Sequence, residues 1–250
     1  MTNTSETTLD TNLAVEHYNH LLNEGFTPDM IWQMEQDGVM SINRMQALKK
    51  GYKLWHGNKY VSSSGLEFPF TNTFGQVRCD QPIERGGRKV KYITPAGAKT
   101  EAALPAGCIA ITEGAKDGWR ASLAGAPTGF VAGVSHIAKA IPPGGKQVIL
   151  FDNDGWVNPQ VCHQLLNASR HTEGKIQLIP DIEGEPKAGI CEYFKAGNTA
   201  DDYKELVANA LWPDEFLYEW IKRWSKYPPS LRARCAKSAA VQTLLMGVVA

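Results

Sequence analysis

The stretch Val148-Ile-Leu-Phe-Asp152-Asn-Asp154-Gly155 joins an apolar run to two carboxylates. A second stretch, Cys108-Ile-Ala-Ile-Thr-Glu113-Gly114, has the same form with a single acid. Short apolar runs of this kind predict buried strands, so each acid should stand where a strand becomes a loop. Residues i and i+2 of an extended chain point the same way, about 6.5 Å apart. Asp152 and Asp154 can therefore face the same cation.

Strands and helices are expected to alternate around these two stretches. Strands are predicted at 108–112, 128–132, 147–151 and 175–179, and helices at 116–124, 134–140, 157–169 and 200–210. This alternation predicts an α/β fold in which helices cover both faces of a parallel sheet. The carboxyl ends of parallel strands meet at one edge, where ligands collect. Glu113 should therefore lie across from Asp152 and Asp154.

Three carboxylates at one edge repel each other unless positive charge lies between them. Mg²⁺ or Mn²⁺ is the natural partner, because both ions prefer oxygen ligands. Such a site can orient a phosphate and stabilise the charge that develops in phosphoryl transfer. The alternative is that these acids are ordinary solvated residues at strand ends. The pairing of Glu-Gly with Asp-x-Asp in one βαβ series favours the metal site.

The other segments of the chain fall into four predicted regions around an α/β domain at 107–210. They are a polar, disordered tail at 1–12, a helical module at 13–54, a strand-rich subdomain at 55–106 and an aromatic, basic linker at 211–250. Within the helical module, a second helix should begin at Pro28 with Thr27 as its N-cap, and a third at Ser41. The chain ends inside an apolar run, so we expect it to be a fragment of a longer polypeptide.

The charge balance limits how this chain could bind nucleic acid. Lys plus Arg number 26 and Asp plus Glu number 26, so the formal net charge is zero. A protein that coats nucleic acid is usually strongly basic, so any contact should come from a local patch. The strand-rich segment holds such a cluster: Arg78, Arg85, Arg88, Lys89 and Lys91. These residues are either solvated hairpin charges or a rim that contacts phosphate.

The sequence also excludes several classes of protein. The polar start lacks the pattern of a signal peptide, and no run of about 18 apolar residues predicts a membrane span. The five cysteines form no CxxC pair, so a zinc ribbon is not encoded. An odd number of cysteines without a secretion signal fits reduced thiols in a cytoplasm.

Four motifs in order resemble the Toprim domain of DnaG-type primases, over about residues 68–203. In chain order they are Phe68-Pro-Phe-Thr-Asn-Thr-Phe-Gly75-Gln-Val, Lys91-Tyr92-Ile-Thr-Pro95, Ile109-Ala-Ile-Thr-Glu113-Gly114-Ala-Lys-Asp117 and the Asp-x-Asp stretch. Within that group, the sequence resembles the Toprim-like domains near the N-termini of plasmid and phage replication proteins. There, too, a short helical module precedes the core.

The resemblance implies a Toprim-type, Rossmann-like sheet and metal-dependent primer synthesis on single-stranded DNA, with a helicase portion beyond Ala250. Carried over residue by residue, it makes Asp152 and Asp154 metal ligands and Glu113 a metal-linked acid or general acid/base. The expected accessory acids are Asp117 and Glu192. The residues expected to contact nucleotide or DNA phosphate are Arg78, Arg88, Lys91 and Lys116.

The sequence departs from the family in two respects, and two other functions stay open. The zinc ribbon that precedes bacterial primase cores is missing, and the third acidic site is reduced to Gly189-Ile-Cys191-Glu192-Tyr. A Toprim nuclease would use similar acids to cleave a phosphodiester. A non-catalytic module that binds DNA in a replication initiator or helicase would keep the fold alone.

Overall fold

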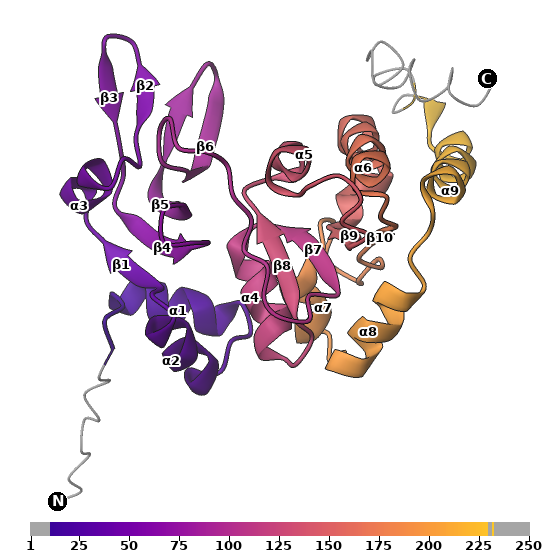
Figure 1. Cartoon of the computed structure of the whole chain (residues 1–250), viewed down its shortest axis with the longest axis horizontal. Coiled ribbons are helices and arrows are strands. Elements are labelled where there is room, and N and C mark those ends of the chain that lie inside the picture. The colour runs from indigo at the N-terminus through magenta and orange to yellow at the C-terminus, as the bar shows by residue number, and fades with distance from the viewer. Residues whose placement is uncertain (1–10, 230–231, 233–250) are drawn as a thin grey trace, which may run out of the picture. The chain divides into compact units, whose positions relative to one another are not determined.

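The computed structural model describes residues 11–229 and residue 232 of this chain (Figure 1). The chain divides into two compact units, Met1–Pro69 with Gly75–Gly97, and Phe70–Phe74 with Ala98–Ala250. Most of the predicted tail at 1–12 and the end of the predicted linker at 211–250 lie outside the described residues. The described part of that linker contains one long helix, α9 (Pro213–Ser225).

The first unit combines an antiparallel sheet with three short helices. The sheet has the order β1-β4-β5-β6, and β2 and β3 form a separate hairpin. The strands are β1 (Met40–Ile42), β2 (Leu54–His56), β3 (Lys59–Val61), β4 (Gly65–Pro69), β5 (Gly75–Arg85) and β6 (Arg88–Ile93). The helices are α1 (Val15–Asn23), α2 (Pro28–Gln36) and α3 (Arg44–Lys49).

The predicted start of α2 is confirmed, whereas the predicted start of the third helix is wrong. Thr27 Oγ1 accepts a hydrogen bond from the Met30 N–H, and Pro28 begins the helix. Ser41 belongs to β1, which pairs with β4, and α3 begins only after Asn43. The side-chain Oδ1 of Asn43 accepts from the Gln46 N–H at 2.9 Å, and the side-chain Oε1 of Gln46 accepts from the Asn43 N–H at 2.7 Å. Because β1 joins the sheet, the helical and strand-rich segments share one compact unit.

The second unit contains the predicted parallel sheet. Its strands are β7 (Ala110–Glu113), β8 (Thr128–Val131), β9 (Val148–Phe151) and β10 (Ile176–Leu178). The sheet order is β10-β9-β7-β8, and each neighbouring pair is parallel. β7 and β9 are neighbours at the centre, so the stretches that end in Glu113 and in Asp152 lie side by side.

Helices cover both faces of this sheet, which confirms the predicted fold class. Ile111, Ile149 and Phe151 pack with the helices α5 (Ile137–Ala140), α6 (Pro159–Thr172) and α9. Ala110 and Leu150 point to the other face, where the helices are α4 (Ala115–Leu123), α7 (Ile190–Lys195) and α8 (Ala200–Ala208). Two 3₁₀ turns, η1 (Val134–His136) and η2 (Asn153–Trp156), follow β8 and β9.

Two close contacts characterise the helices α4 and α9 of the second unit. Gly118 lets α4 approach the sheet, because a Cβ there would lie 2.2 Å from the Phe130 ring. On α9, the indole rings of Trp220 and Trp224 stack with centroids 5.1 Å apart and an interplanar angle of 13°. Both indoles are buried, one turn apart on the face of α9 that packs on the core.

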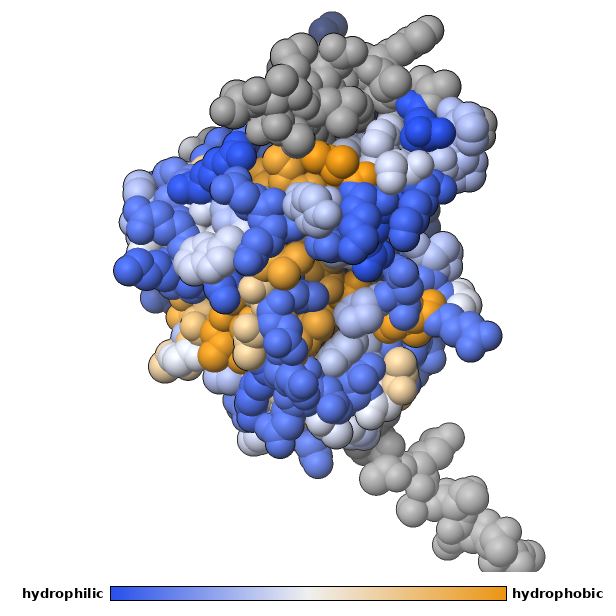
Figure 2. Space-filling model, turned by 90° about the vertical axis from the view of Figure 1, so that its right-hand side faces the viewer, coloured by the Kyte–Doolittle hydropathy of each residue, from blue (hydrophilic) through white to orange (hydrophobic). Residues whose placement is uncertain are grey.

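Apolar side chains also reach the surface. On the face in Figure 2, hydrophobic residues lie among larger hydrophilic areas. The exposed large side chains include Trp32, Trp55, Trp212 and Tyr218. Among the described residues, no helix is long and apolar enough to cross a membrane.

Candidate active site

Asp152 and Asp154 meet at the carboxyl end of β9, and a lysine lies between them. Lys187 Nζ lies 3.2 Å from Asp152 Oδ2 and 3.1 Å from Asp154 Oδ2. The η2 turn makes this possible, because it follows β9 directly and folds Asp154 back toward the strand end. The two carboxylates therefore converge on one positive charge, but through a 3₁₀ turn and not through the extended i, i+2 geometry that the sequence predicted.

Asn153 positions the loop that carries Lys187. Its backbone N–H donates to the Ala188 carbonyl at 3.0 Å, and its side-chain oxygen accepts from the Ala188 N–H at 2.9 Å. Its amide nitrogen also donates to Asp181 Oδ1 at 3.3 Å. Asn153 therefore connects the loop after β10 to the end of β9. Its partner in that loop, Ala188, directly follows Lys187.

Sequence reasoning missed both Lys187 and Asn153. The loop at 179–189 has no periodic pattern, so nothing local predicts where its lysine lies. One signal was available, since loops that follow parallel strands line the ligand edge of such sheets. A cationic side chain in the loop after the fourth strand could have been proposed on that ground.

Glu113 stands at the end of β7, the strand that neighbours β9. Gly114 follows with φ +89°, a left-handed conformation that glycine adopts without strain. Part of the Glu113 side chain is exposed, but surrounding protein atoms desolvate the carboxyl, and this effect raises its pKa. Lys187 lowers the pKa of Glu113, whereas Asp154 and Asp117 raise it. Glu113 therefore belongs to the same electrostatic cluster as the aspartates.

Burial governs the charges at this edge of the sheet. Burial, followed by the nearby Asp117, raises the pKa of Asp152 to about 7, against the opposing effect of Lys187. Burial alone would lower the pKa of Lys187, but Asp152 and Asp154 reverse that effect and raise it. The lysine therefore stays protonated and compensates the carboxylate charge.

The two predicted accessory acids both contact the start of α7. Asp117 Oδ1 accepts from the Cys191 N–H at 3.1 Å, and Glu192 Oε2 accepts from the Gly189 N–H at 2.9 Å. Burial is the main reason why the pKa of Asp117 is raised. Both carboxylates therefore satisfy backbone donors that the first turn of a helix leaves free. Their predicted catalytic role stays a prediction.

The predicted nucleic-acid contacts are divided between the units. Lys116 lies on α4 of the second unit, next to Asp117. Arg78 lies on β5 opposite Tyr92, and Arg88 and Lys91 are exposed on β6 of the first unit. Successive residues of a strand alternate between faces, so Lys91 points to the face opposite Tyr92. The structure therefore does not bring the predicted basic residues together on one face.

The three acids expected to bind a metal do not form one ligand group in the structure. In the part of the chain that the structure describes, no group of three or more His, Cys, Asp or Glu side chains is placed to hold a metal ion. A pocket of about 410 Å³ lies along the loop after β10 and includes Asn153, the residue between the two aspartates. Its other lining residues are Asp181, Ile182, Gly184, Glu185 and Pro186.

Comparison with known proteins shows a likeness in fold to a solved structure. No protein-family model matches the chain, and no curated protein matches it. A solved structure described as the DnaG primase catalytic domain bound to ssDNA is similar, with a TM-score of 0.55 and 12% sequence identity. The match covers 94% of this chain and 87% of that chain. At this identity the likeness concerns the fold alone, and the chain has the fold of a primase catalytic domain.

Proposed function

We propose that this chain is a primase-like catalytic domain of a DNA replication protein, which joins nucleotides into a primer on single-stranded DNA with Mg²⁺ or Mn²⁺. The observation that carries the proposal is the convergence of Asp152 and Asp154 on one cationic atom, Lys187 Nζ, at 3.2 and 3.1 Å. The fold supports the same class of function, since the similar primase domain was solved with ssDNA.

The donor set fits a hard divalent cation, because the two carboxylates already gather positive charge at one point. Asp152 and Asp154 would hold the ion, which when bound supplies positive charge for phosphoryl transfer. Glu113, on the neighbouring strand, would accept the proton of an attacking 3′-hydroxyl. Lys187 has a side chain that is 59% exposed, so it can turn from the aspartates toward a substrate phosphate.

A specific observation favours a second candidate, a non-catalytic DNA-binding module. Lys187 already neutralises the acid pair, and Glu192 at the third acidic position is hydrogen-bonded to the backbone of its own helix. A chain that had lost metal binding would keep the fold and present only its basic residues to DNA. The two candidates differ in whether Glu113 takes part in chemistry.

The test measures turnover and DNA affinity in parallel for wild type and Glu113→Gln. This change keeps the shape of the side chain and removes its charge. We expect primer synthesis from labelled nucleotides on a single-stranded template to fall about a hundredfold or more, the usual range for a lost acid/base group. The Kd for the template should stay within about twofold, because the basic residues carry that contact.

Glu183→Gln is the matched control, since Glu183 is an exposed acid in the loop after β10. Circular dichroism spectra of both variants should match wild type, which checks that they fold. Wild-type turnover in Glu113→Gln would contradict the catalytic role. No primer synthesis by wild type together with normal DNA binding would favour the non-catalytic module. Loss of a labelled DNA strand under Mn²⁺ would instead indicate a nuclease.

A further inference from the structure

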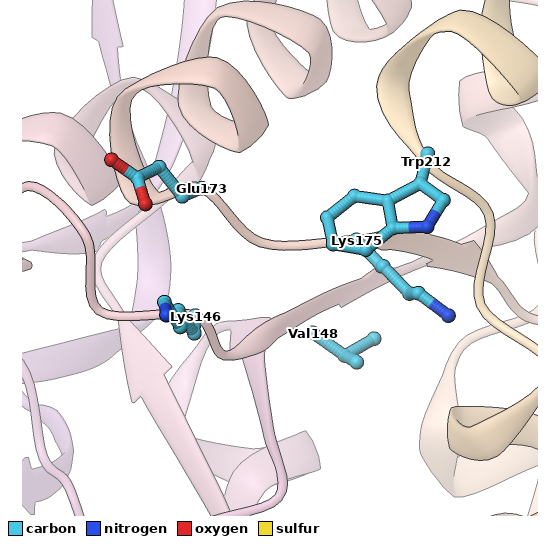
Figure 3. A pocket seen from close by; sticks show the side chains of 5 residues that line it. All are labelled: Lys146, Val148, Glu173, Lys175 and Trp212. Atoms are coloured by element: carbon cyan, nitrogen blue, oxygen red, sulfur yellow. The ribbon is translucent and has the colours of Figure 1, made fainter.

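A second pocket lies at the edge of the parallel sheet opposite to the acids. Five residues line it, Lys146, Val148, Glu173, Lys175 and Trp212, around a volume of about 370 Å³ (Figure 3). Val148 is the first residue of β9, and Lys175 directly precedes β10. The pocket therefore opens at the amino ends of these strands. Asp152 and Asp154 follow the carboxyl end of β9, so the two sites are separated by the length of a strand.

A backbone bridge holds the indole of Trp212 beside this edge. Ile176 and Leu211 exchange two backbone hydrogen bonds, of 2.8 and 2.9 Å, which place the next residue, Trp212, against the start of β10. The Trp212 side chain is half exposed, and Lys175 Nζ lies 5.2 Å from the centroid of its ring. The backbone N–H of Trp212 donates to Glu215 at the start of α9. Because this contact joins the Trp212 backbone to the Glu215 side chain, it does not involve the indole.

The backbone of the pocket is unusual in its conformation. Lys146 and Glu173 have φ of +59° and +53°, and among the described residues they are the only non-glycine residues with positive φ. Glu173 ends α6 in this conformation, as many helices end. Lys146 does not end a helix, so helix termination does not explain its positive φ. Its N–H donates to the Thr172 carbonyl at 2.8 Å. Strained residues of this kind cluster at binding sites, so the placement of the Lys146 side chain is the feature to explain.

The chemistry of the lining matches a nucleotide. The half-exposed indole, with Lys175 Nζ over its ring, offers aromatic surface on which any base can stack. Lys146 and Lys175 supply two ammonium groups for a phosphate, and Glu173 supplies an acceptor for a sugar hydroxyl or a base amino group. An apolar floor comes from Val148. We propose that this pocket binds one nucleotide unit, with its base on Trp212 and its phosphate at the two lysines.

The unit could come from single-stranded DNA or from a free nucleoside triphosphate, which share this chemistry. The proposal does not depend on the acid pair, and the test separates the two sites. All titrations are done in EDTA, so that binding that needs a divalent cation does not contribute. One arm follows the anisotropy of labelled oligo(dT), and the other measures ATP binding by calorimetry.

Trp212→Ala should weaken oligo(dT) binding about tenfold, the effect expected when one base loses its stacking partner. Trp212→Phe should retain most of the affinity, because a phenyl ring still stacks. The double change of Lys146→Ala and Lys175→Ala should lower the salt slope by about 1.4, from roughly 0.7 for each lost phosphate contact. Tyr218→Ala is the matched control, since Tyr218 is a more exposed aromatic residue on α9, the helix that begins just after Trp212, and lies outside the pocket.

The two arms identify the source of the nucleotide. A Trp212→Ala effect on oligo(dT) without ATP binding by wild type assigns the pocket to the DNA strand. ATP binding that Trp212→Ala weakens equally assigns it to a free nucleotide. If Trp212→Ala binds both ligands as wild type and Tyr218→Ala do, with an unchanged circular dichroism spectrum, the proposal is overturned. A loss of primer synthesis in Glu113→Gln tests the acid pair and does not bear on the proposal for the Trp212 pocket.

Discussion

Lys187 is the positive charge that the two aspartates of the acid pair share. It contacts both aspartates and lies within the electrostatic reach of Glu113. The sequence predicted that Asp152 and Asp154 face one cation, because their spacing is local. It could not predict that a lysine 33 residues beyond Asp154 takes that place. The position of Lys187 depends on the Asn153–Ala188 hydrogen bonds, which join segments far apart in the chain.

The first prediction at this scale is that Lys187→Met strengthens binding of Mn²⁺. The lysine and the ion compete for the same two carboxylate oxygens. Removing the lysine should therefore raise the Mn²⁺ affinity about tenfold or more, because a gain of about 1.4 kcal/mol in binding free energy corresponds to a factor of ten. In EDTA the variant should unfold at a lower temperature, because a partly buried carboxylate pair has lost its counter-charge. Calorimetric titration and thermal unfolding with and without Mn²⁺ measure both effects.

Lys195→Met provides the control, since Lys195 is an exposed lysine at the end of α7 in the same unit. It should leave both the metal affinity and the unfolding temperature unchanged. Weaker metal binding in Lys187→Met would mean that the lysine supports the loop rather than competing with the ion.

At the scale of elements, patterns with local causes were predicted well. All four strands of the parallel sheet lie within two residues of their predicted bounds, because each is a short apolar run bounded by turn residues. β1 was missed because three residues, Met40–Ile42, form a strand only through pairing with β4, about 25 residues later. α7 was missed although Glu192 caps its start locally, and Asp117 adds a contact there that is not local.

The β5–β6 hairpin provides the prediction at this scale. Arg78 and Arg88 lie on the face of Tyr92, whereas Lys91 lies on the other face. A single DNA strand on the Tyr92 face should meet the two arginines only. We expect the double change of Arg78→Ala and Arg88→Ala to lower the salt slope of single-stranded DNA binding by about 1.4, and Lys91→Ala to leave it unchanged. Equal effects of all three residues would show that the strand does not follow one face.

At the scale of the whole molecule, the two compact units divide the proposed tasks. The acid pair and the Trp212 pocket belong to the second unit, and the basic hairpin belongs to the first. The chain is formally neutral, but its charges are not mixed evenly: the acid pair lies at an edge of one unit, and basic residues gather elsewhere. The sequence predicted the parallel sheet of the second unit, whereas the grouping of the N-terminal helices with β4, β5 and β6 required long-range pairing.

This division predicts where ligands protect the backbone from hydrogen exchange. Mn²⁺ should slow exchange in η2 and in the loop that carries Lys187, because it would fix the carboxylates at their common edge. It should leave the β5–β6 hairpin unchanged, whereas single-stranded DNA without metal should protect that hairpin. Exchange measured by mass spectrometry on wild type and on Asp152→Asn, which should lose only the metal effect, checks this. Metal protection spread evenly over both units would contradict it.

The stacked pair of Trp220 and Trp224 has an optical consequence. Two indole rings 5.1 Å apart and nearly parallel have coupled electronic transitions. Coupled transitions of this kind give a pair of circular-dichroism bands of opposite sign, which disappears when either ring moves away. Because the two rings lie one turn apart on the same helix, the paired bands depend on the helical geometry of α9 and on the placement of its buried indoles. The chain thus contains its own spectroscopic probe of the state of α9, without any added label.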